Sequence, residues 1–262
     1  MKQVEKKTAR IDGVVFFGGN ERECLGYLAS RMDSGERTAV YTPNPIMLEN
    51  AARSPAFRAV LGRADLNLPD GIGVVLAGKM LGERVEGRIS GVDMGRRVLA
   101  LAAGRGYRVF LLGGREGVAR EAAARLVSKT FGLRICGARN GYFAAHETRD
   151  VLEEIRRAKP DILFVCLGSP RQELFIDRYR EALPDVKLFM ALGGTLDVFA
   201  ERVRRAPLPM QKMGLEWLWR MVREPRRLRD LPKMAAFSRR MLKKSCQSAH
   251  NGQINPSVLK KI

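Results

Sequence analysis

The sequence is poor in the residues that build metal sites and disulfide frameworks. Its 262 residues include two histidines, His146 and His250, which stand far apart. The four cysteines form no CxxC pair and are scattered at Cys24, Cys136, Cys166 and Cys246. This spacing indicates neither a zinc site nor a disulfide framework, and it is typical of incidental thiols in a reducing compartment.

Long hydrophobic runs are missing as well. The charged start of the chain leads only to the short apolar stretch Val14–Phe17, which Gly18 and Gly19 end before a signal-peptide core could form. No apolar run reaches the roughly 18 residues that span a bilayer. We therefore expect the protein to stay in the cytoplasm and to have no membrane-spanning segment.

Positive charge is what the chain has in excess. The formal net charge is +19, and 45% hydrophobic residues at this length suffice to bury a full core. Residues 201–262 hold 16 Lys and Arg against 4 Asp and Glu, so the excess is concentrated there. A charge of this size predicts an anionic partner or an anionic surface.

Short apolar runs alternate with amphipathic stretches of helical period from Gly13 to about Phe199. This alternation predicts an α/β, Rossmann-like fold with a mainly parallel sheet flanked by helices. The expected strands are Val14–Phe17, Thr38–Tyr41, Leu66–Leu68, Arg108–Leu112, Arg134–Ala138, Ile162–Leu167 and Leu188–Leu192.

Three parts of the chain are expected. Residues 1–200 form the α/β ligand-binding domain, and residues 201–244 form a basic helical appendage. Residues 245–262 are polar, contain Gly252 and Pro256, and are predicted to be a disordered tail.

Several of the predicted strands end in polar or glycine-rich segments. Open parallel sheets bind ligands beyond the carboxyl ends of their strands, where loops and helix N-termini present backbone N–H groups. We expect five such segments to converge on one cleft, namely 42–45, 69–71, 113–114, 168–173 and 193–197.

Two charged residues, one in such a loop and one in a polar segment between two predicted helices, allow more than one interpretation. Asp70 is either a turn former or helix cap, or a carboxylate that accepts a proton from an attacking hydroxyl. Arg88 is either a solvated surface charge or a guanidinium that binds phosphate oxygens in a bidentate manner. Asp93 nearby is expected to cap the next helix.

Two loops each precede a predicted helix and could contact a ligand together with the first turn of that helix. Gly113 and Gly114 either cradle a diphosphate with bare amides or simply make a tight turn. In the segment 168–173, Gln172 can donate to and accept from sugar hydroxyls, while Glu173 could be a helix cap.

The helical segment 215–229 combines Trp217 and Trp219 with many arginines. Such a segment can lie on an anionic membrane, close over a diphosphate, or bind nucleic acid. No RNP, KH or helix-turn-helix pattern supports the last option.

Six strings together resemble one family, the WecG/TagA/CpsF glycosyltransferases. They occur in the family order and cover roughly residues 10 to 230. They are TPNPIMLENA (42–51), LNLPDGIGVVLAGKMLG (66–82), RISGVDM (88–94), VFLLGG (109–114), DILFVCLGSPRQE (161–173) and RAPLPMQKMGLEWLWRMVREPRRL (205–228).

The resemblance implies an inverting transferase that uses a UDP-sugar and extends a saccharide carried on undecaprenyl diphosphate. The transferred sugar in such enzymes is N-acetylmannosamine, its uronic acid or glucose, and the product enters cell-envelope or exopolysaccharide assembly. The resemblance also implies a peripheral position on the inner face of the cell membrane, where the C-terminal arginines contact the anionic surface and close over the site.

The resemblance assigns roles to individual residues. Asp70 corresponds to the catalytic base, Thr42 and Asn44 to a nearby polar pair, Arg88 to a diphosphate or acceptor contact and Gln172 to a sugar contact. Further substrate-binding residues are expected at Gly113, Gly114, Arg171, Glu173, Asp197, Arg220, Arg223 and Arg227. Two departures are Arg171, where the family commonly has Lys, and the string Leu196-Asp197-Val198-Phe199-Ala200-Glu201, where it has Phe-Asp followed by Ala-Gly.

No aspartate in the chain has another aspartate two residues away, so a metal-binding D-x-D sequence is lacking. We therefore expect no metal and no cofactor, with arginines offsetting the charge of the departing diphosphate. The competing hypotheses are a nucleic-acid-binding protein and an NAD-dependent dehydrogenase on a similar sheet. Apolar helix faces could bury a subunit interface, so a homo-oligomer is a further expectation that the sequence allows.

Overall fold

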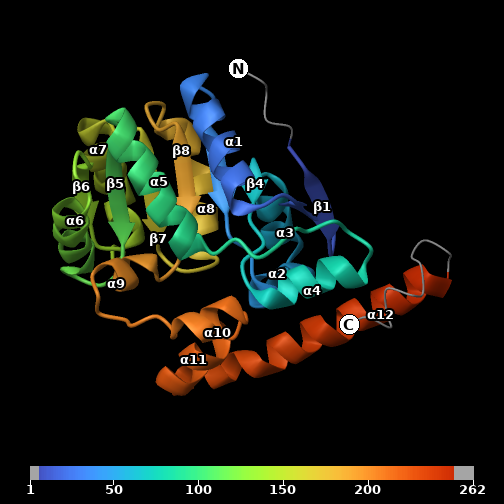
Figure 1. Cartoon of the computed structure of the whole chain (residues 1–262). Coiled ribbons are helices and arrows are strands. Elements are labelled where there is room, and N and C mark those ends of the chain that lie inside the picture. Colours follow the sequence, from blue (N-terminus) through green and yellow to red (C-terminus); the bar gives the residue numbers. More distant parts are fainter. Residues whose placement is uncertain (1–5, 251–262) are drawn as a thin grey trace.

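A computed structural model describes residues 6–250 (Figure 1). Its centre is a six-stranded sheet in the order β4-β3-β8-β7-β5-β6, and every neighbouring pair of strands is parallel. This sheet confirms the predicted α/β fold class. The strands are β3 (Thr38–Tyr41), β4 (Leu66–Asn67), β5 (Arg108–Gly113), β6 (Arg134–Arg139), β7 (Ile162–Cys166) and β8 (Leu188–Ala191).

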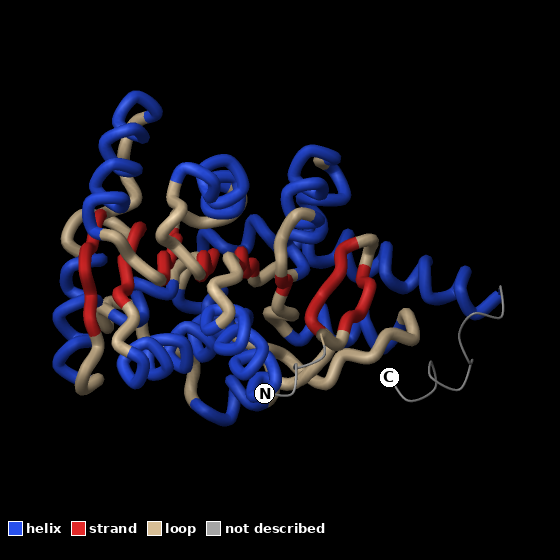
Figure 2. The backbone as a smooth tube through the Cα atoms, turned by 90° about the horizontal axis from the view of Figure 1, so that it is seen from above, coloured by secondary structure: helices blue, strands red, loops and turns tan. Residues whose placement is uncertain are grey.

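Helices cover both faces of this sheet, as the row of strands between two helical layers in Figure 2 shows. One core contains residues of α2 (Pro45–Arg53), α3 (Pro55–Gly62), α4 (Ile72–Met80), α7 (Thr148–Ala158) and α8 (Arg171–Tyr179). The other core contains residues of α1 (Glu21–Asp33), α5 (Gly91–Arg105), α6 (Val118–Lys129) and α9 (Thr195–Phe199). The four central strands, β3, β8, β7 and β5, are buried on both faces and are mainly apolar runs, whereas the edge strand β6 is partly exposed.

The segment Val14–Phe17 is a strand, as predicted, but it does not join the parallel sheet. It forms β2, which pairs antiparallel with β1 (Thr8–Ile11) in a separate two-stranded sheet. Asp12 and Gly13 connect the two strands and both have positive φ angles, 53° and 81°. Asp-Gly is a favoured two-residue hairpin connection, because both central residues of such turns need φ above zero. The placement of this strand in the main sheet was therefore wrong.

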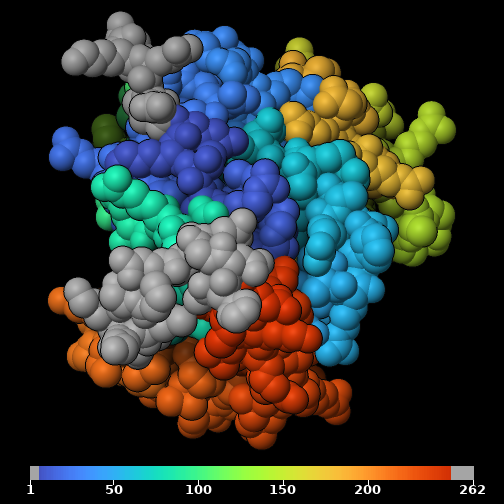
Figure 3. Space-filling model, turned by 90° about the vertical axis from the view of Figure 1, so that its right-hand side faces the viewer, coloured from blue at the N-terminus to red at the C-terminus, as the bar shows by residue number. Residues whose placement is uncertain are grey.

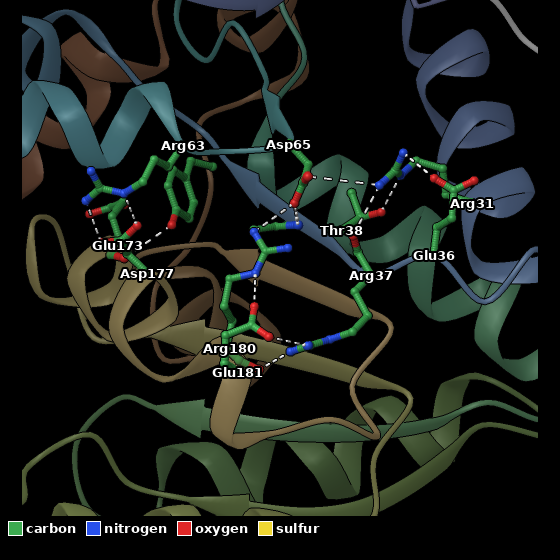
Figure 4. A network of polar contacts seen from close by, with 12 residues as sticks. Arg31, Glu36, Arg37, Thr38, Arg63, Asp65, Glu173, Asp177, Arg180 and Glu181 are labelled. Carbon is green, nitrogen blue, oxygen red and sulfur yellow. Dashed lines mark hydrogen bonds and ion pairs between the residues drawn. The ribbon is translucent and has the colours of Figure 1, made fainter.

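A network of ion pairs lies at the amino ends of β3 and β4 (Figure 4). The Asp65 carboxylate accepts from the backbone N–H of Ala39 at 2.8 Å and from Arg180 at 3.1 Å. Arg180 begins the short helix η2 (Arg180–Ala182), which follows α8. This network holds the end of α8 at the amino ends of the strands. The opposite edge of the sheet, at the carboxyl ends of the strands, stays open for a ligand site.

The C-terminal part of the chain is helical, as predicted. It consists of α10 (Leu208–Lys212), α11 (Glu216–Arg223), η3 (Pro225–Asp230) and α12 (Leu231–His250), whereas the remaining short helix, η1 (Ala145–Glu147), precedes α7. In Figure 1, α12 runs along one edge of the molecule beside α2 and α4. No helix among residues 6–250 is long and apolar enough to cross a bilayer.

The start of the expected disordered tail at Ser245 needs a correction. The helix α12 continues to His250. The Ser245 side chain is fully buried and donates to the backbone oxygen of Met80 at 2.7 Å, which holds this part of the helix against α4. Residues 251–262 lie outside the described part of the chain.

Candidate active site

A cavity of about 270 Å³ lies between the carboxyl ends of β3 and β4 and the C-terminal helices. The turn before α11 comes close to α4 at Gly214, where φ is 73° and a Cβ atom would lie 2.7 Å from the Cβ of Ile72. Glycine is therefore needed here for the close approach. The residues around the cavity include Asn44, Ile46, Asp70, Ile72, Arg88, Ser90, Glu216, Trp217, Arg220, Met221, Arg227, Met234 and Phe237.

Asp70 is in the loop between β4 and α4 and faces this cavity. The first helical turn of α4 follows Gly71 and has no side-chain cap, so Asp70 is not a helix cap. Within residues 6–250, its carboxylate accepts no hydrogen bond. This geometry leaves the carboxylate available to a ligand.

Burial raises the pKa of Asp70 above its ordinary value, and Arg88 and Arg220 oppose this shift. The negative charges of Glu216 and Asp93 add to the increase. A carboxyl group with a raised pKa in a cavity is typical of a proton-accepting group in catalysis.

Asn44 caps α2 and also lines the cavity. Its side-chain oxygen accepts from the backbone N–H groups of Ile46 and Met47, both at 3.0 Å, so only its amide nitrogen remains for a ligand. Thr42 is separate from the cavity lining, because its buried hydroxyl donates to the backbone oxygen of Ala191 at 3.0 Å and joins β3 to β8. The predicted pair of Thr42 and Asn44 is therefore divided between a structural contact and the cavity.

Glu216, in the first turn of α11, is surrounded by three arginines. It lies 3.2 Å from Arg88, 3.0 Å from Arg205 and 3.8 Å from Arg220. The Arg88 side chain is 18% exposed and that of Glu216 only 8%, which rules out a solvated surface role for Arg88. These contacts hold α11 against the loop that precedes α5.

Arg205 extends the same network to Asp93. Its guanidinium contacts both carboxylate oxygens of Asp93 as well as Glu216. Asp93 is therefore an ion-pair partner as well as a first-turn residue of α5. Burial would raise the pKa of Glu216, but Arg205, Arg220 and Arg88 hold that pKa below its ordinary value. Three cations face two carboxylates, so the network keeps positive charge beside Asp70.

Gln172 and Glu173 are buried behind the strand ends rather than exposed in the cavity. The Gln172 side chain accepts from the backbone N–H of Gly193 at 2.9 Å and donates to Glu173 at 2.7 Å. Burial raises the pKa of Glu173. Arg171 donates to the backbone oxygen of Gly141 at 3.2 Å. These contacts join the ends of β7 and β8, and they support the structural interpretation of this segment.

Gly113 and Gly114 make a tight turn at the end of β5. A Cβ atom on Gly113, at φ 140°, would lie 2.2 Å from the backbone oxygen of Cys166. The N–H of Gly114 already donates to that same oxygen at 3.2 Å. The structure therefore favours the turn interpretation over a diphosphate cradle.

The remaining predicted site residues also divide into some that line the cavity and some that do not. Arg220 and Arg227 line the cavity, whereas Arg223 does not and lies 4.9 Å from the centroid of the Trp219 ring. Asp197 is in α9, outside the cavity lining. The cavity thus brings together Asn44, Asp70, Arg88, Arg220 and Arg227.

Sequence reasoning missed Glu216 and Arg205 as site residues. A single glutamate in the apolar and aromatic string 215–219 is a signal that could have identified Glu216. Nothing in the sequence distinguishes Arg205 from its neighbour Arg204. Among residues 6–250, no cluster of three or more His, Cys, Asp or Glu side chains could hold a metal ion. The metal-free reaction stays a prediction.

The comparison with known proteins decides between the competing hypotheses. A model of the glycosyl transferase WecG/TagA/CpsF family matches residues 9–251. The chain belongs to this family. The protein is therefore a glycosyltransferase, which decides against the dehydrogenase and the nucleic-acid-binding protein.

Two curated proteins are similar to this chain over most of their length. Both are named N-acetylglucosaminyldiphosphoundecaprenol N-acetyl-beta-D-mannosaminyltransferase. The one from Bacillus spizizenii (strain W23) is 34% identical over 226 residues, which cover 85% of this chain and 87% of the relative. The one from Bacillus subtilis (strain 168) is 32% identical over 233 residues, which cover 87% of this chain and 90% of the relative.

The two adjacent arginines of this family member allow a matched test of the network around Glu216. Arg205→Gln leaves Asp93 and Glu216 without their shared partner, so we expect a loss of about 3–5 kcal/mol in the free energy of unfolding. The exposed Arg204 is the control, and Arg204→Gln should change this energy by less than about 0.5 kcal/mol. Urea unfolding followed by tryptophan fluorescence measures both, since Trp217 and Trp219 lie in α11. Equal stability of the two variants would contradict the role of Arg205.

Proposed function

We propose that this glycosyltransferase moves a sugar from a UDP-sugar onto a saccharide linked to undecaprenyl diphosphate, in cell-envelope or exopolysaccharide biosynthesis. The observation that carries the proposal is Asp70, an unpaired carboxylate in a cavity that also contains Arg88, Arg220 and Arg227. The names of the two Bacillus relatives favour N-acetylmannosamine over its uronic acid or glucose as the transferred sugar.

The chemistry proposed for the cavity is a single displacement with inversion. Asp70 takes the proton of an acceptor hydroxyl, and the hydroxyl oxygen forms a bond to the anomeric carbon of the donor sugar. The bond from that carbon to the diphosphate oxygen breaks, and UDP leaves with the bonding electron pair. Arg88, Arg220 and Arg227 offset the new negative charge on the diphosphate.

The walls of the cavity support a lipid-linked acceptor. Met221, Met234 and Phe237 of the C-terminal helices lie opposite Ile46 and Ile72 of the α/β part, so apolar side chains border the arginines. An apolar wall of this kind fits the hydrocarbon chain of the acceptor, while the arginines beside it bind the diphosphate of the donor. We place the donor nucleotide beside this cavity, along the carboxyl ends of β5, β7 and β8, where Gln172, Asp197 and the other strand-end residues stay predicted contacts.

A peripheral position on the inner face of the membrane is the second part of the proposal. Apolar side chains on the outer surface of the C-terminal helices are exposed, among them Leu218, Val222 and Leu228. Arg223 and Arg226 lie between Val222 and Leu228 in the sequence, Arg229 follows Leu228, and all three arginines are exposed. Apolar side chains flanked by arginines are typical of segments that lie on anionic membranes.

Asp70→Asn tests the proposed base. The amide keeps the shape of the side chain but cannot take the proton, so we expect kcat to fall by about 10²–10⁴-fold with little change in UDP affinity. A purified assay with UDP-N-acetylmannosamine and a lipid-diphosphate-linked N-acetylglucosamine acceptor, with the product identified by mass, measures the rate. Asp230→Asn, at another carboxylate of the same cavity, is the control and should lose less than about tenfold. Near-normal turnover of Asp70→Asn would show that another group is the base.

The pH dependence of kcat/KM tests the electrostatic surroundings of Asp70. Activity should fall as the pH drops through the pKa of Asp70, because only the ionised carboxylate accepts a proton. Glu216 helps to raise this pKa, so Glu216→Gln should lower it and move the acidic limb of the profile to lower pH. The control is Glu201→Gln, at an exposed residue paired with Arg125 and Lys129, which should leave the limb in place. A shift toward higher pH would be the opposite of this expectation.

Flotation with anionic liposomes tests the membrane-binding surface. Leu218→Asp combined with Val222→Asp puts two negative charges on the exposed face of α11, so we expect the full chain to lose most of its liposome binding. Phe131→Asp, at an exposed apolar residue just after α6, is the matched control and should float like the unaltered protein. Equal flotation of both variants would place the contact elsewhere.

A further inference from the structure

The helix α12 forms one wall of the Asp70 cavity although it lies at the C-terminal end of the chain. Met234, Phe237 and Ser238 line the cavity from this helix. Phe237 and Met241 are buried in the same core as residues of α2 and α4. Apolar packing is not directional, so it does not by itself fix where along α2 the helix lies.

Two carboxylates are buried beneath α12. The side chain of Asp12, in the turn between β1 and β2, is 1% exposed, and that of Glu49, in α2, is 4% exposed. A buried carboxylate is costly unless it is paired and hydrogen-bonded. These two residues therefore need cations from the segment that covers them.

Arg240 of α12 supplies the cation for both carboxylates. Its Nε and Nη2 atoms donate to Asp12 at 3.1 and 2.9 Å, and its Nη1 atom donates to Glu49. Lys244, one turn later, donates to the other oxygen of Asp12 at 2.6 Å. Arg53 donates to the second oxygen of Glu49 at 2.7 Å. Burial would raise the pKa of Glu49, but Arg240 and Arg53 hold it below its ordinary value.

This group of ion pairs joins three distant segments of the chain. In Figure 3 the end of the C-terminal segment, in red, lies directly against blue surfaces from the first part of the sequence. A planar guanidinium donates in several directions at fixed angles, which suits contact with two carboxylates at once. A slip of α12 by one helical turn, about 5.4 Å, would leave both carboxylates without this partner.

The same pairs lie close to the cavity along both helices. Arg240 is three residues after Phe237 on α12, and Glu49 is three residues after Ile46 on α2. Residues three apart on a helix share one face. Phe237 and Ile46 are both cavity-lining residues, so the contact between Arg240 and Glu49 sets the spacing between these two walls.

We propose that Arg240 is a positioning residue for glycosyl transfer: by binding Asp12 and Glu49 it fixes α12 against α2 in the register that closes the cavity around Asp70. This inference rests on the proposed function, in which the transfer takes place in that cavity. Arg240 does not line the cavity itself and acts through the cavity-lining residues of its helix.

Arg240→Gln in the full chain tests this role, with the exposed neighbour Arg239→Gln as the matched control. Hydrogen–deuterium exchange should show at least roughly tenfold faster exchange in α12 of Arg240→Gln, while β5 and β7 stay protected. In the transferase assay, KM for the lipid-linked acceptor should rise by about tenfold or more and kcat should change less, because a smaller fraction of the enzyme has a closed cavity. Arg239→Gln should match the unaltered protein in both measurements.

Two further variants keep the test decisive if Arg240→Gln does not fold. Arg240→Lys keeps the charge without the guanidinium. We expect it to change α12 exchange and the acceptor KM in the same direction as Arg240→Gln, but by less. The double variant Glu49→Gln with Arg240→Gln removes the α2 carboxylate together with its partner, so it should lose no more α12 protection and no more acceptor affinity, measured as KM, than Arg240→Gln alone. Two residues that acted independently would instead show losses that add.

Several outcomes would overturn the inference. It fails if Arg240→Gln behaves like Arg239→Gln, if its acceptor KM rises while α12 stays protected, or if the losses of Glu49→Gln and Arg240→Gln add in the double variant. A lack of transferase activity in the unaltered protein would instead contradict the proposed function. Hydrogen–deuterium exchange would then still decide whether Arg240 holds α12.

Discussion

The contact of one buried carboxylate with three arginines is the interaction on which the site depends. Glu216 lies between Arg88 of the α/β part and Arg205 and Arg220 of the C-terminal segment. Glu216 joins the two parts next to the loop between β4 and α4, which contains Asp70. Because the arginines outnumber the carboxylates that they contact, the assembled site is attractive to a diphosphate.

In our proposal Asp70 accepts a proton, and the same arrangement sets its pKa for that role. Burial and the nearby carboxylates raise its pKa, and the arginines limit that increase. A base with a raised pKa is better suited to proton transfer near neutral pH than a fully solvated carboxylate. The electrostatic balance thus depends on the C-terminal helices being in place.

Ion pairs hold the C-terminal segment on both sides of the cavity. The network around Glu216 fixes α11, and the pairs of Arg240 with Asp12 and Glu49 fix α12. Between them, Met221, Met234 and Phe237 complete an apolar wall. The outer face keeps its exposed apolar side chains for another contact, which in our proposal is the membrane. A segment held by inward charges can present an apolar face outward, because its attachment does not depend on burying that face.

The sequence alone determined the fold class, the seven strands β2 to β8 and two residues that line the cavity, Asp70 and Arg88. A buried parallel strand is a continuous apolar run, and the loop after it is recognised by the polar and glycine residues that follow this run. Both features are therefore visible in a short stretch of sequence. The Asp12-Gly13 turn that pairs Val14–Phe17 with β1 is local too, although it was not used to predict this hairpin. The contacts of Arg88 with Glu216 and of Arg240 with Asp12 are not local, because these residues are 128 and 228 positions apart. Only the tertiary structure decided these partners and separated Gln172, Gly113 and Gly114 from the cavity, because an ion pair depends on which surfaces meet, and a sequence pattern describes each surface by itself.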